Sequence, residues 1–207
     1  MEKPILFSTP MVQAILDGRK TQTRREIKQA NGWDHNWRPT LIKEEHIDGI
    51  PRYEMRCGTQ YSLPWFKCPY GQPGDVLWVR ESYSKDYFDF NGGNHAYKAD
   101  WNKTDAEYVS EPKWKPSIHM PKAACRLFLR ITNVRVERLQ NISEEDAIAE
   151  GIGKDNAGWW KDYTHPDSAG YMVAKNSFRS LWHSINGEQS WNDNPWVWVV
   201  EFEQIKK

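Results

Sequence analysis

Residues 18–25, with the sequence GRKTQTRR, concentrate side chains that could bind or act on a ligand. They bring hydrogen-bond donors and a potential nucleophile together within six positions: Lys20, Thr21, Thr23, Arg24 and Arg25. On composition alone, an exposed basic strand is a slightly better interpretation, because most clusters of lysine and arginine are solvated. The segment nevertheless follows a helix end and does not lie on a solvated helix face, so it is the first candidate for a functional centre.

A helix is expected immediately before this basic segment. Pro10 is typical of the first helical position, and the apolar residues from Met11 to Leu16 recur at helical spacing. Gly18 is a typical helix terminator. The basic segment therefore begins where a capped helix ends.

A second short helix is predicted between Ser143 and Gly151. Ser143 and Asp146 have the spacing of a capping box, and acidic residues fill the first turn. Glu150 lies about 60° from Ala147 on a helical wheel, at the border of the apolar face. We therefore expect the Glu150 carboxylate to reach a buried cleft.

Several short strands and one further helix are also predicted. Residues 76–81 alternate so that Glu81 shares the apolar face. Residues 125–132 alternate in the same way and then change phase at Val134, which predicts a bulge or a corner. Residues 196–202 are apolar enough for a strand buried on both faces. A third, amphipathic helix should end at Gly187, with apolar positions at Met172, Phe178, Leu181, Trp182 and Ile185.

These elements predict a mixed α+β protein in which a small barrel-like sheet is flanked by helices. We expect one domain spanning residues 1–207. Long loop insertions are expected at about 27–73, 84–122 and 153–170, with a possible strand at 95–98.

The bulk composition restricts the classes of function. Lys+Arg and Asp+Glu both total 28, so the net charge is zero and no overall field recruits long nucleic acid or a membrane. The N-terminus lacks a signal-peptide pattern, and no run of about 18 apolar residues occurs, so we expect a cytoplasmic protein without a membrane partner. For each of the twelve tryptophans, core packing is a better interpretation than stacking on a flat ligand.

Cysteines and histidines do not predict a disulfide framework or a metal site. Cys57, Cys68 and Cys125 are irregularly spaced and contain no CxxC pair, which favours a reducing compartment. His95 and His119 fall in unrelated loops, and neither an HxH nor an HExxH pattern occurs. We therefore expect no metal site.

Four sequence blocks together resemble the ASCH superfamily, whose members have a PUA-like barrel fold. In order, these are GRKTQTRR after a capped helix, PGDVLWV, ISEEDAIAEG and VWVVEF. Within that superfamily, the chain is similar to small bacterial amidohydrolases that remove the acyl group from N4-acetylcytidine. The longer form, with CPYGQPGDVLWVRES and WKPSIHMP, is similar to ASCH proteins common in phages and prophages. One departure is Arg24, which stands where the amidohydrolase motif has an apolar residue.

The resemblance implies a catalytic set of Lys20, Thr23 and Glu150 acting on a small nucleoside or nucleobase ligand. In this hypothesis Thr23 attacks the acyl carbon, Lys20 activates Thr23 or stabilises the oxyanion, and Glu150 orients Lys20 or shuttles the proton. Burial would lower a lysine pKa from about 10.4, whereas a neighbouring glutamate would raise it. No metal or organic cofactor enters this chemistry.

Five further residues are second-rank candidates for substrate binding. Arg25 ends the basic motif, and Glu81 lies on the inward face of its strand, although exposure at a strand end is an equally good interpretation of Glu81. Trp78, Tyr83 and His119 could contact a base by stacking or hydrogen bonding. For each of these three, a structural role is the better interpretation.

Two other functions remain open at this stage. A non-catalytic reader of RNA or of modified bases in single-stranded nucleic acid could use the same cleft, with phosphate contacts from Arg19, Lys20, Arg24, Arg25 and Lys28. A zero net charge argues against extended contacts but not against a single flipped base. A ribonuclease is the third possibility, since that activity has been attributed to some ASCH relatives, but no acidic metal-binding cluster supports it here.

Overall fold

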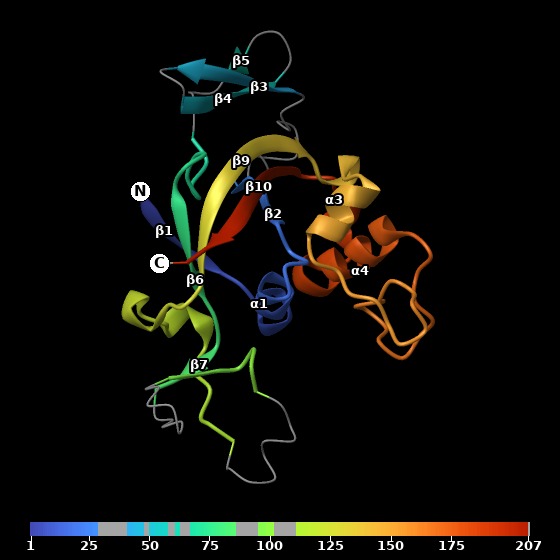
Figure 1. Cartoon of the computed structure of the whole chain (residues 1–207). Helices are drawn as coiled ribbons and strands as arrows, with labels where there is room; N and C mark the ends of the chain where they lie inside the picture. Colours follow the sequence, from blue (N-terminus) through green and yellow to red (C-terminus); the bar gives the residue numbers. More distant parts are fainter. Residues whose placement is uncertain are drawn as a thin grey trace.

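A five-stranded sheet forms the centre of the protein, in a computed structural model that describes residues 1–28, 41–47, 50–57, 61–62, 67–85, 95–101 and 111–206. The strand order is β1 (Glu2–Leu6), β6 (Val76–Arg80), β9 (Phe128–Arg138), β10 (Trp196–Ile205) and β2 (Gln22–Glu26). β1 pairs with β6 in parallel, and the other neighbours are antiparallel. Strands β1 and β2 therefore form the outer edges, and β9 and β10 form a long curved pair between them (Figure 1).

The central pair β9 and β10 carries two features that the sequence predicts. Val197, Trp198 and Val199 in β10 are at most 1% exposed, which confirms a strand buried on both faces. The register shifts between Glu201 and Phe202, whose partners are Asn133 and Ile131, so β9 contains an extra residue at this point. The predicted phase change is therefore a β-bulge.

The mixed α+β class is confirmed, but the sheet does not close into the expected barrel. Within the described part of the chain, β1 and β2 do not pair, so the sheet keeps two open edges. The side chain of Arg25 on β2 crosses the space between them, and its Nη2 donates to the carbonyl oxygen of Leu6 on β1 at 2.6 Å. A side chain and a cavity thus occupy the place where backbone pairing would close a barrel.

Helix α1 (Thr9–Leu16) connects the two outer strands and agrees with the prediction for this segment. It has Pro10 in its first turn and buries a compact apolar face that comprises Met11, Val12, Ala14 and Ile15. Gly18, just beyond its end, has a φ of 72°, a conformation that favours glycine. The chain then turns directly into the basic segment and β2.

Helix α3 (Glu144–Ala149) begins and ends as its sequence predicts. The Ser143 side chain accepts a hydrogen bond from the backbone nitrogen of Asp146 at 3.1 Å, which is the capping interaction. Glu150 occupies the C-terminal cap position, and Gly151 follows with a φ of 85°. Glu150 is therefore held at the well-ordered end of a short helix.

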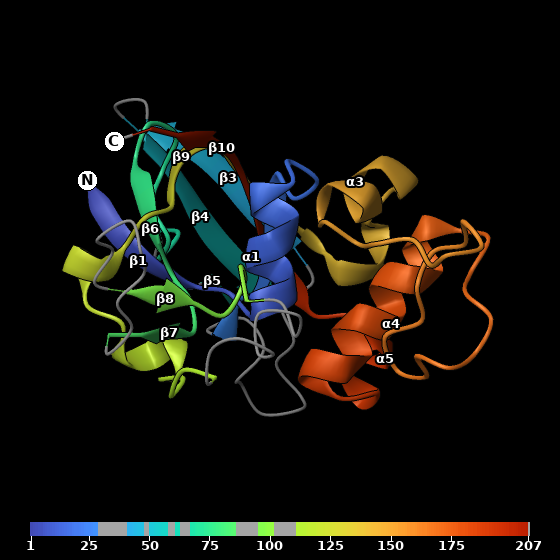
Figure 2. The same cartoon turned by 60° about the horizontal axis from the view of Figure 1, so that its bottom comes forward.

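Helices α4 (Ala174–Asn186) and α5 (Gln189–Asn192) lie on the opposite side of α1 from most of the strands (Figure 2). The predicted amphipathic helix is α4, and its buried apolar side chains include Phe178, Leu181 and Trp182. Met172 and Ile185, which were expected on the apolar face, are 80% and 64% exposed. Met172 precedes the helix, so its apparent helical spacing has no structural consequence.

The segment 27–73, which was expected to be a long loop insertion, contains regular strands in its described part. It forms a three-stranded antiparallel sheet whose strands are β3 (Leu41–Ile47), β4 (Ile50–Cys57) and β5 (Tyr61–Ser62). Tyr53 is fully buried, packs edge-on against Trp198 with ring centroids 4.7 Å apart, and donates its hydroxyl to the Val134 carbonyl at 3.1 Å. This small sheet is therefore anchored to the central sheet by at least one side chain.

The remaining elements are short. β7 (Tyr83–Ser84) pairs with β8 (Ala96–Tyr97), which agrees with the possible strand at 95–98. Single 3-10 turns cover Ser117–His119, Lys122–Ala124 and Leu139–Asn141. Much of the expected insertion 84–122 lies outside the described residues. Among the helices that are described, none combines the length and apolarity needed to cross a membrane.

Candidate functional site

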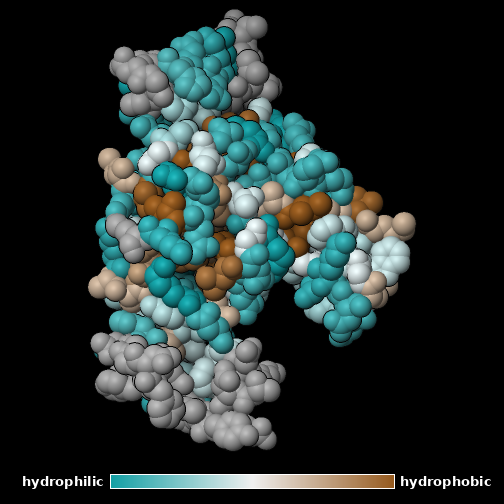
Figure 3. Space-filling view, in the orientation of Figure 1, coloured by the Kyte–Doolittle hydropathy of each residue, from teal (hydrophilic) through white to brown (hydrophobic). Residues whose placement is uncertain are grey.

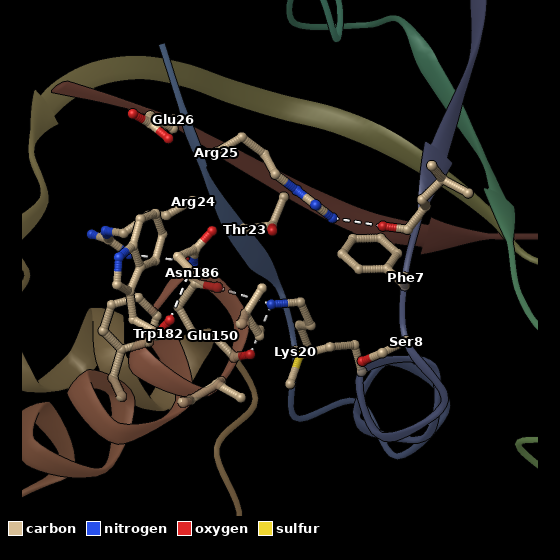
Figure 4. A pocket seen from close by; sticks show the side chains of 15 residues that line it. Phe7, Ser8, Lys20, Thr23, Arg24, Arg25, Glu26, Glu150, Trp182 and Asn186 are labelled. Carbon is tan, nitrogen blue, oxygen red and sulfur yellow. Dashed lines mark hydrogen bonds and ion pairs between the residues drawn. The ribbon is translucent and has the colours of Figure 1, made fainter. Parts of the chain in front are cut away.

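A cavity lies along the open edge of β2, between the end of β1, helix α1 and helix α4 (Figure 4). Its volume is about 210 Å³. Figure 3 shows a notch in the surface where the α4 side of the molecule meets the sheet side. The cavity is surrounded by side chains from four parts of the chain: Leu6, Phe7, Ser8, Met11, Lys20, Thr23, Arg24, Arg25, Glu26, Glu150, Phe178, Leu181, Trp182, Ile185 and Asn186.

The backbone brings Lys20 and Glu150 together although 130 positions separate them. The two residues form an isolated antiparallel bridge, and the Thr21 nitrogen donates to the Ala149 carbonyl at 2.9 Å. Gly151 permits this approach, since a Cβ added to it would lie 2.7 Å from the Lys20 Cβ. A glycine after α3 is therefore required both by its positive φ and by the closeness of Lys20.

Lys20 and Glu150 form a buried ion pair at the cavity. The Lys20 Nζ donates to Glu150 Oε2 at 2.9 Å and to the Glu150 carbonyl oxygen at 2.8 Å, and the side chains are 2% and 4% exposed. Burial lowers the pKa of Lys20 below its usual value, and the charges of Arg25 and Arg24 act in the same direction, while Glu150 opposes them. A lysine with a lowered pKa can act as a proton acceptor closer to neutral pH.

Thr23 lies on β2, opposite Val200 of β10, and is 4% exposed. Strand alternation places Thr23 and Arg25 on the same face, toward the cavity. In Figure 4 the Thr23 hydroxyl points into the space that the Lys20 amine also faces. Within the described ranges no protein group hydrogen-bonds to this hydroxyl, so it is available to a ligand.

Arg24 lines the cavity, but it does not have the role in phosphate contacts that the sequence offered for it in a nucleic-acid reader, because carboxylates of the protein occupy its guanidinium. Its side chain is 0% exposed, and its guanidinium contacts Glu137 at 2.5 Å, Asp146 at 2.7 Å and Glu150 at 3.1 Å. Burial tends to lower the pKa of Arg24, but Glu150 and the other carboxylates outweigh it and raise the pKa. The interpretation of residues 18–25 as a solvated basic strand is wrong at this position, because three carboxylates from other elements replace water.

Arg25 also reaches the cavity and lies over Phe7, with the guanidinium carbon 5.3 Å from the ring centroid. Its Nη2 donates to the Leu6 carbonyl, whereas its Nε is buried and has no hydrogen-bond partner in the described part of the chain. An unpaired buried donor is costly, and a ligand acceptor would relieve that cost. Arg25 is therefore suited to contact a polar group of a bound molecule.

The other four predicted binding residues do not line this cavity. Glu81 is 1% exposed, so it is not an exposed strand end, but Arg126 binds both of its oxygens at 2.9 and 3.1 Å. Burial raises the pKa of Glu81, and the hydrogen bonds from Arg126 lower it only in part. Trp78 lies on β6, and the Tyr83 hydroxyl donates to the His119 carbonyl at 3.2 Å. Glu81 faces inward as predicted, but its carboxylate binds Arg126 and does not reach the cavity.

Helix α4 supplies five cavity residues that the sequence did not identify as part of a site: Phe178, Leu181, Trp182, Ile185 and Asn186. Its apolar spacing predicted a buried face, and part of that face, Phe178, Leu181 and Trp182, borders the cavity. The Trp182 Nε1 donates to the Ser190 hydroxyl at 2.8 Å, which fixes the indole ring. Periodicity could identify these residues as apolar, but not distinguish a wall of a cavity from a core contact.

Potential metal ligands are not grouped in the described residues: none of their histidine, cysteine, aspartate and glutamate side chains form a set of three that could hold an ion. Cys68 is buried and Cys125 is partly buried, and both are free thiols. The polar side chains that line the cavity are Ser8, Lys20, Thr23, Arg24, Arg25, Glu26, Glu150 and Asn186.

Comparison with models of known protein families and with curated proteins gives no match. Among solved structures, the chain is similar to an ASCH domain from Lactobacillus crispatus JV V101, with a TM-score of 0.37 and 14% sequence identity. The alignment covers 100% of this chain and 80% of that chain.

Proposed function

We propose that this protein is an amidohydrolase that removes an acyl group from N4-acylated cytidine or from a related small nucleobase amide. The observation that carries this proposal is the convergence of Lys20, Thr23 and Glu150 on one cavity, from segments as much as 130 positions apart. A nucleophile, a proton carrier and a carboxylate that orients it are the groups such a hydrolysis requires.

The proposed reaction has two stages. The Thr23 oxygen attacks the acyl carbon while its proton passes to the neutral Lys20 amine, and the tetrahedral intermediate expels the exocyclic nitrogen of the base, which takes up that proton. Water then attacks the acyl-threonine ester with Lys20 as the base again, releasing the carboxylic acid and restoring Thr23. Glu150 holds Lys20 in place, and the Arg25 Nε is a candidate donor to the carbonyl oxygen.

The shape and walls of the cavity support a small, flat substrate. Phe7, Phe178 and Trp182 place three aromatic rings around it. Its volume of about 210 Å³ is below the roughly 300–1,000 Å³ of sites for drug-sized ligands. A base-sized amide fits these dimensions better than a longer substrate enclosed along its whole length.

Incubation of the purified protein with N4-acetylcytidine, followed by chromatography for cytidine and acetate, tests the proposal. Lys20→Met, Thr23→Val and Glu150→Gln should each reduce turnover by about a hundredfold or more. Glu81→Gln is the matched control, because Glu81 is an equally buried, arginine-paired carboxylate outside the cavity, and this variant should keep its activity. No turnover by the wild type, or equal turnover by Lys20→Met, would refute the assignment.

A binding protein for modified bases, free or within RNA, is the second candidate. The buried, unpaired Nε of Arg25 beside the aromatic walls favours it, since these groups would recognise a base without any reaction. Binding of N4-acetylcytidine with no release of cytidine, and with equal affinity in Thr23→Val, would favour this function over hydrolysis.

A further inference from the structure

Glu150 shares its two carboxylate oxygens between two different cations. Lys20 binds Oε2 at 2.9 Å, and Arg24 binds Oε1 at 3.1 Å. All three side chains are nearly inaccessible, with exposures of 2%, 0% and 4% for Lys20, Arg24 and Glu150. In such a setting, water screens these charges only weakly, so each strongly affects the others.

Arg24 is fixed in this position by two further carboxylates. Its Nε and Nη2 both donate to Glu137 Oε1, at 3.0 and 2.5 Å, and its Nη2 also donates to Asp146 Oδ2 at 2.7 Å. Glu137 comes from β9, whereas Asp146 and Glu150 come from α3 and its end. The guanidinium thus connects strand β2 to both elements and holds Glu150 in one orientation.

Arg24 and its neighbour Arg135 differ in the carboxylates that they bind. Arg135 on β9 binds Asp146 at 2.8 Å and Glu137 at 3.4 Å, and it also contacts Glu201 on β10. Arg24 and Arg25 both line the cavity, but Arg25 binds the Leu6 carbonyl oxygen and not these carboxylates. Of the two arginines that bind Glu137 and Asp146, Arg24 alone also binds Glu150.

Stability alone does not account for a buried arginine at this position. Removing a guanidinium from water is expensive, and buried ion networks are commonly no more stabilising than apolar side chains of similar volume. The Arg24 guanidinium also lies 5.9 Å from the centroid of the Phe178 ring, so it is buried between an aromatic ring and carboxylates. Buried charges that perturb one another at a cavity are instead typical of functional sites.

We propose that Arg24 is a positioning residue that divides the Glu150 carboxylate between two cations and so leaves the Lys20 amine free to release and regain its proton. Burial lowers the pKa of Lys20 most, while the charge of Glu150 and its hydrogen bond to the amine raise it. Arg24 takes part of the Glu150 charge and adds its own repulsion, in the same direction as burial and Arg25. The role of Arg24 in turnover rests on the proposed hydrolysis, but its effect on the protonation of Lys20 does not.

Two substitutions of Arg24 and one matched control test this inference. Arg24→Met removes the charge, Arg24→Lys keeps a charge that can reach fewer carboxylates, and Arg135→Met removes an arginine that binds Glu137 and Asp146 but not Glu150. The titration of Lys20 is followed by NMR in protein labelled with ¹³C at the lysine ε carbons, and Lys20→Met identifies its signal.

We expect Arg24→Met to raise the pKa of Lys20 by about one unit or more, and Arg24→Lys to raise it less. Arg135→Met should leave it within a few tenths of a unit of the wild type. In turnover, the rise of kcat with pH should move to higher pH by the same amount in Arg24→Met, with KM little changed, because Arg24 acts through Glu150 and Lys20.

An unchanged Lys20 titration in Arg24→Met would overturn the inference, as would an equal shift in Arg135→Met, because that would indicate a general effect of the ion network. If Arg24→Met does not fold, Arg24→Lys decides: a smaller rise supports the inference, and no change overturns it. Absence of turnover in the wild type would refute the proposed hydrolysis, while the titration would still decide the effect of Arg24 on Lys20.

Discussion

The approach of α3 to Lys20 depends on a single glycine, and replacing Gly151 by alanine tests that dependence. A Cβ at position 151 would lie 2.7 Å from the Lys20 Cβ and 2.9 Å from the Ala14 Cβ. Neither neighbour is the free end of a flexible side chain, so the backbone itself must move. Gly151 also has a φ of 85°, which alanine adopts only with strain.

Gly18→Ala is a matched control for this substitution. Gly18 follows helix α1 as Gly151 follows α3, and it has a φ of 72°, but a Cβ there would meet nothing within 4 Å. The left-handed conformation costs each variant roughly 1–2 kcal/mol, and the reduced freedom of the unfolded chain offsets part of this equally in both. Overpacking adds about 1–3 kcal/mol to Gly151→Ala only.

Urea denaturation of both variants measures the difference. We expect Gly151→Ala to lose about 1–3 kcal/mol more of its free energy of unfolding than Gly18→Ala loses. Displacement of Lys20 should also lower the turnover of N4-acetylcytidine in Gly151→Ala. If both variants lose the same stability, the close contact between Gly151 and Lys20 does not constrain the fold, and the reasoning fails.

Three further predictions concern the elements that hold the site. Burial tends to raise the pKa of Asp146, but its hydrogen bonds and its charge interactions with Arg24 and Arg135 lower it overall. This group therefore stabilises the fold above its unfolded pKa of about 3.9 and loses that contribution as the pH falls through its lower folded value. Asp146→Asn should accordingly flatten the acid side of a plot of unfolding free energy against pH, and an unchanged slope would contradict this. Ser143→Ala, which removes the cap of α3, should cost about 1 kcal/mol in urea denaturation. Tyr53→Phe should cost about 1 kcal/mol by the same measurement through loss of its bond to the Val134 carbonyl, and no loss would show that this anchor contributes little.

Local features of the chain could be predicted because residues a few positions apart decide them. Pro10 and Ser143 start helices α1 and α3, and Gly18 and Gly151 follow their ends, as the residue types indicate. Alternation also predicted the inward direction of Glu81. The strands of segment 27–73 were missed, since their alternation is weak and a proline, Pro51, lies within β4.

Burial of charge could not be predicted in this way, because partners from distant parts of the chain determine it. Arg24 looks like a solvated cation in sequence, yet carboxylates from β9 and α3 surround it in the fold. Glu81 and Glu150 were both predicted to face inward. Only the tertiary structure decided that Glu81 would pair with Arg126 and that Glu150 would meet Lys20 at a cavity.

By itself, the sequence determined which groups were available, where two helices would cap and which strands would be buried. The tertiary structure decided which charges meet, and how far the sheet would close. The physical reason is that capping and strand alternation depend on near neighbours along the chain, whereas the pKa of Lys20 depends on burial and on Glu150, from the end of another element. Residues 18–25 thus form part of a candidate site because Glu150, at the end of α3, and side chains of α4 lie along the open edge of β2.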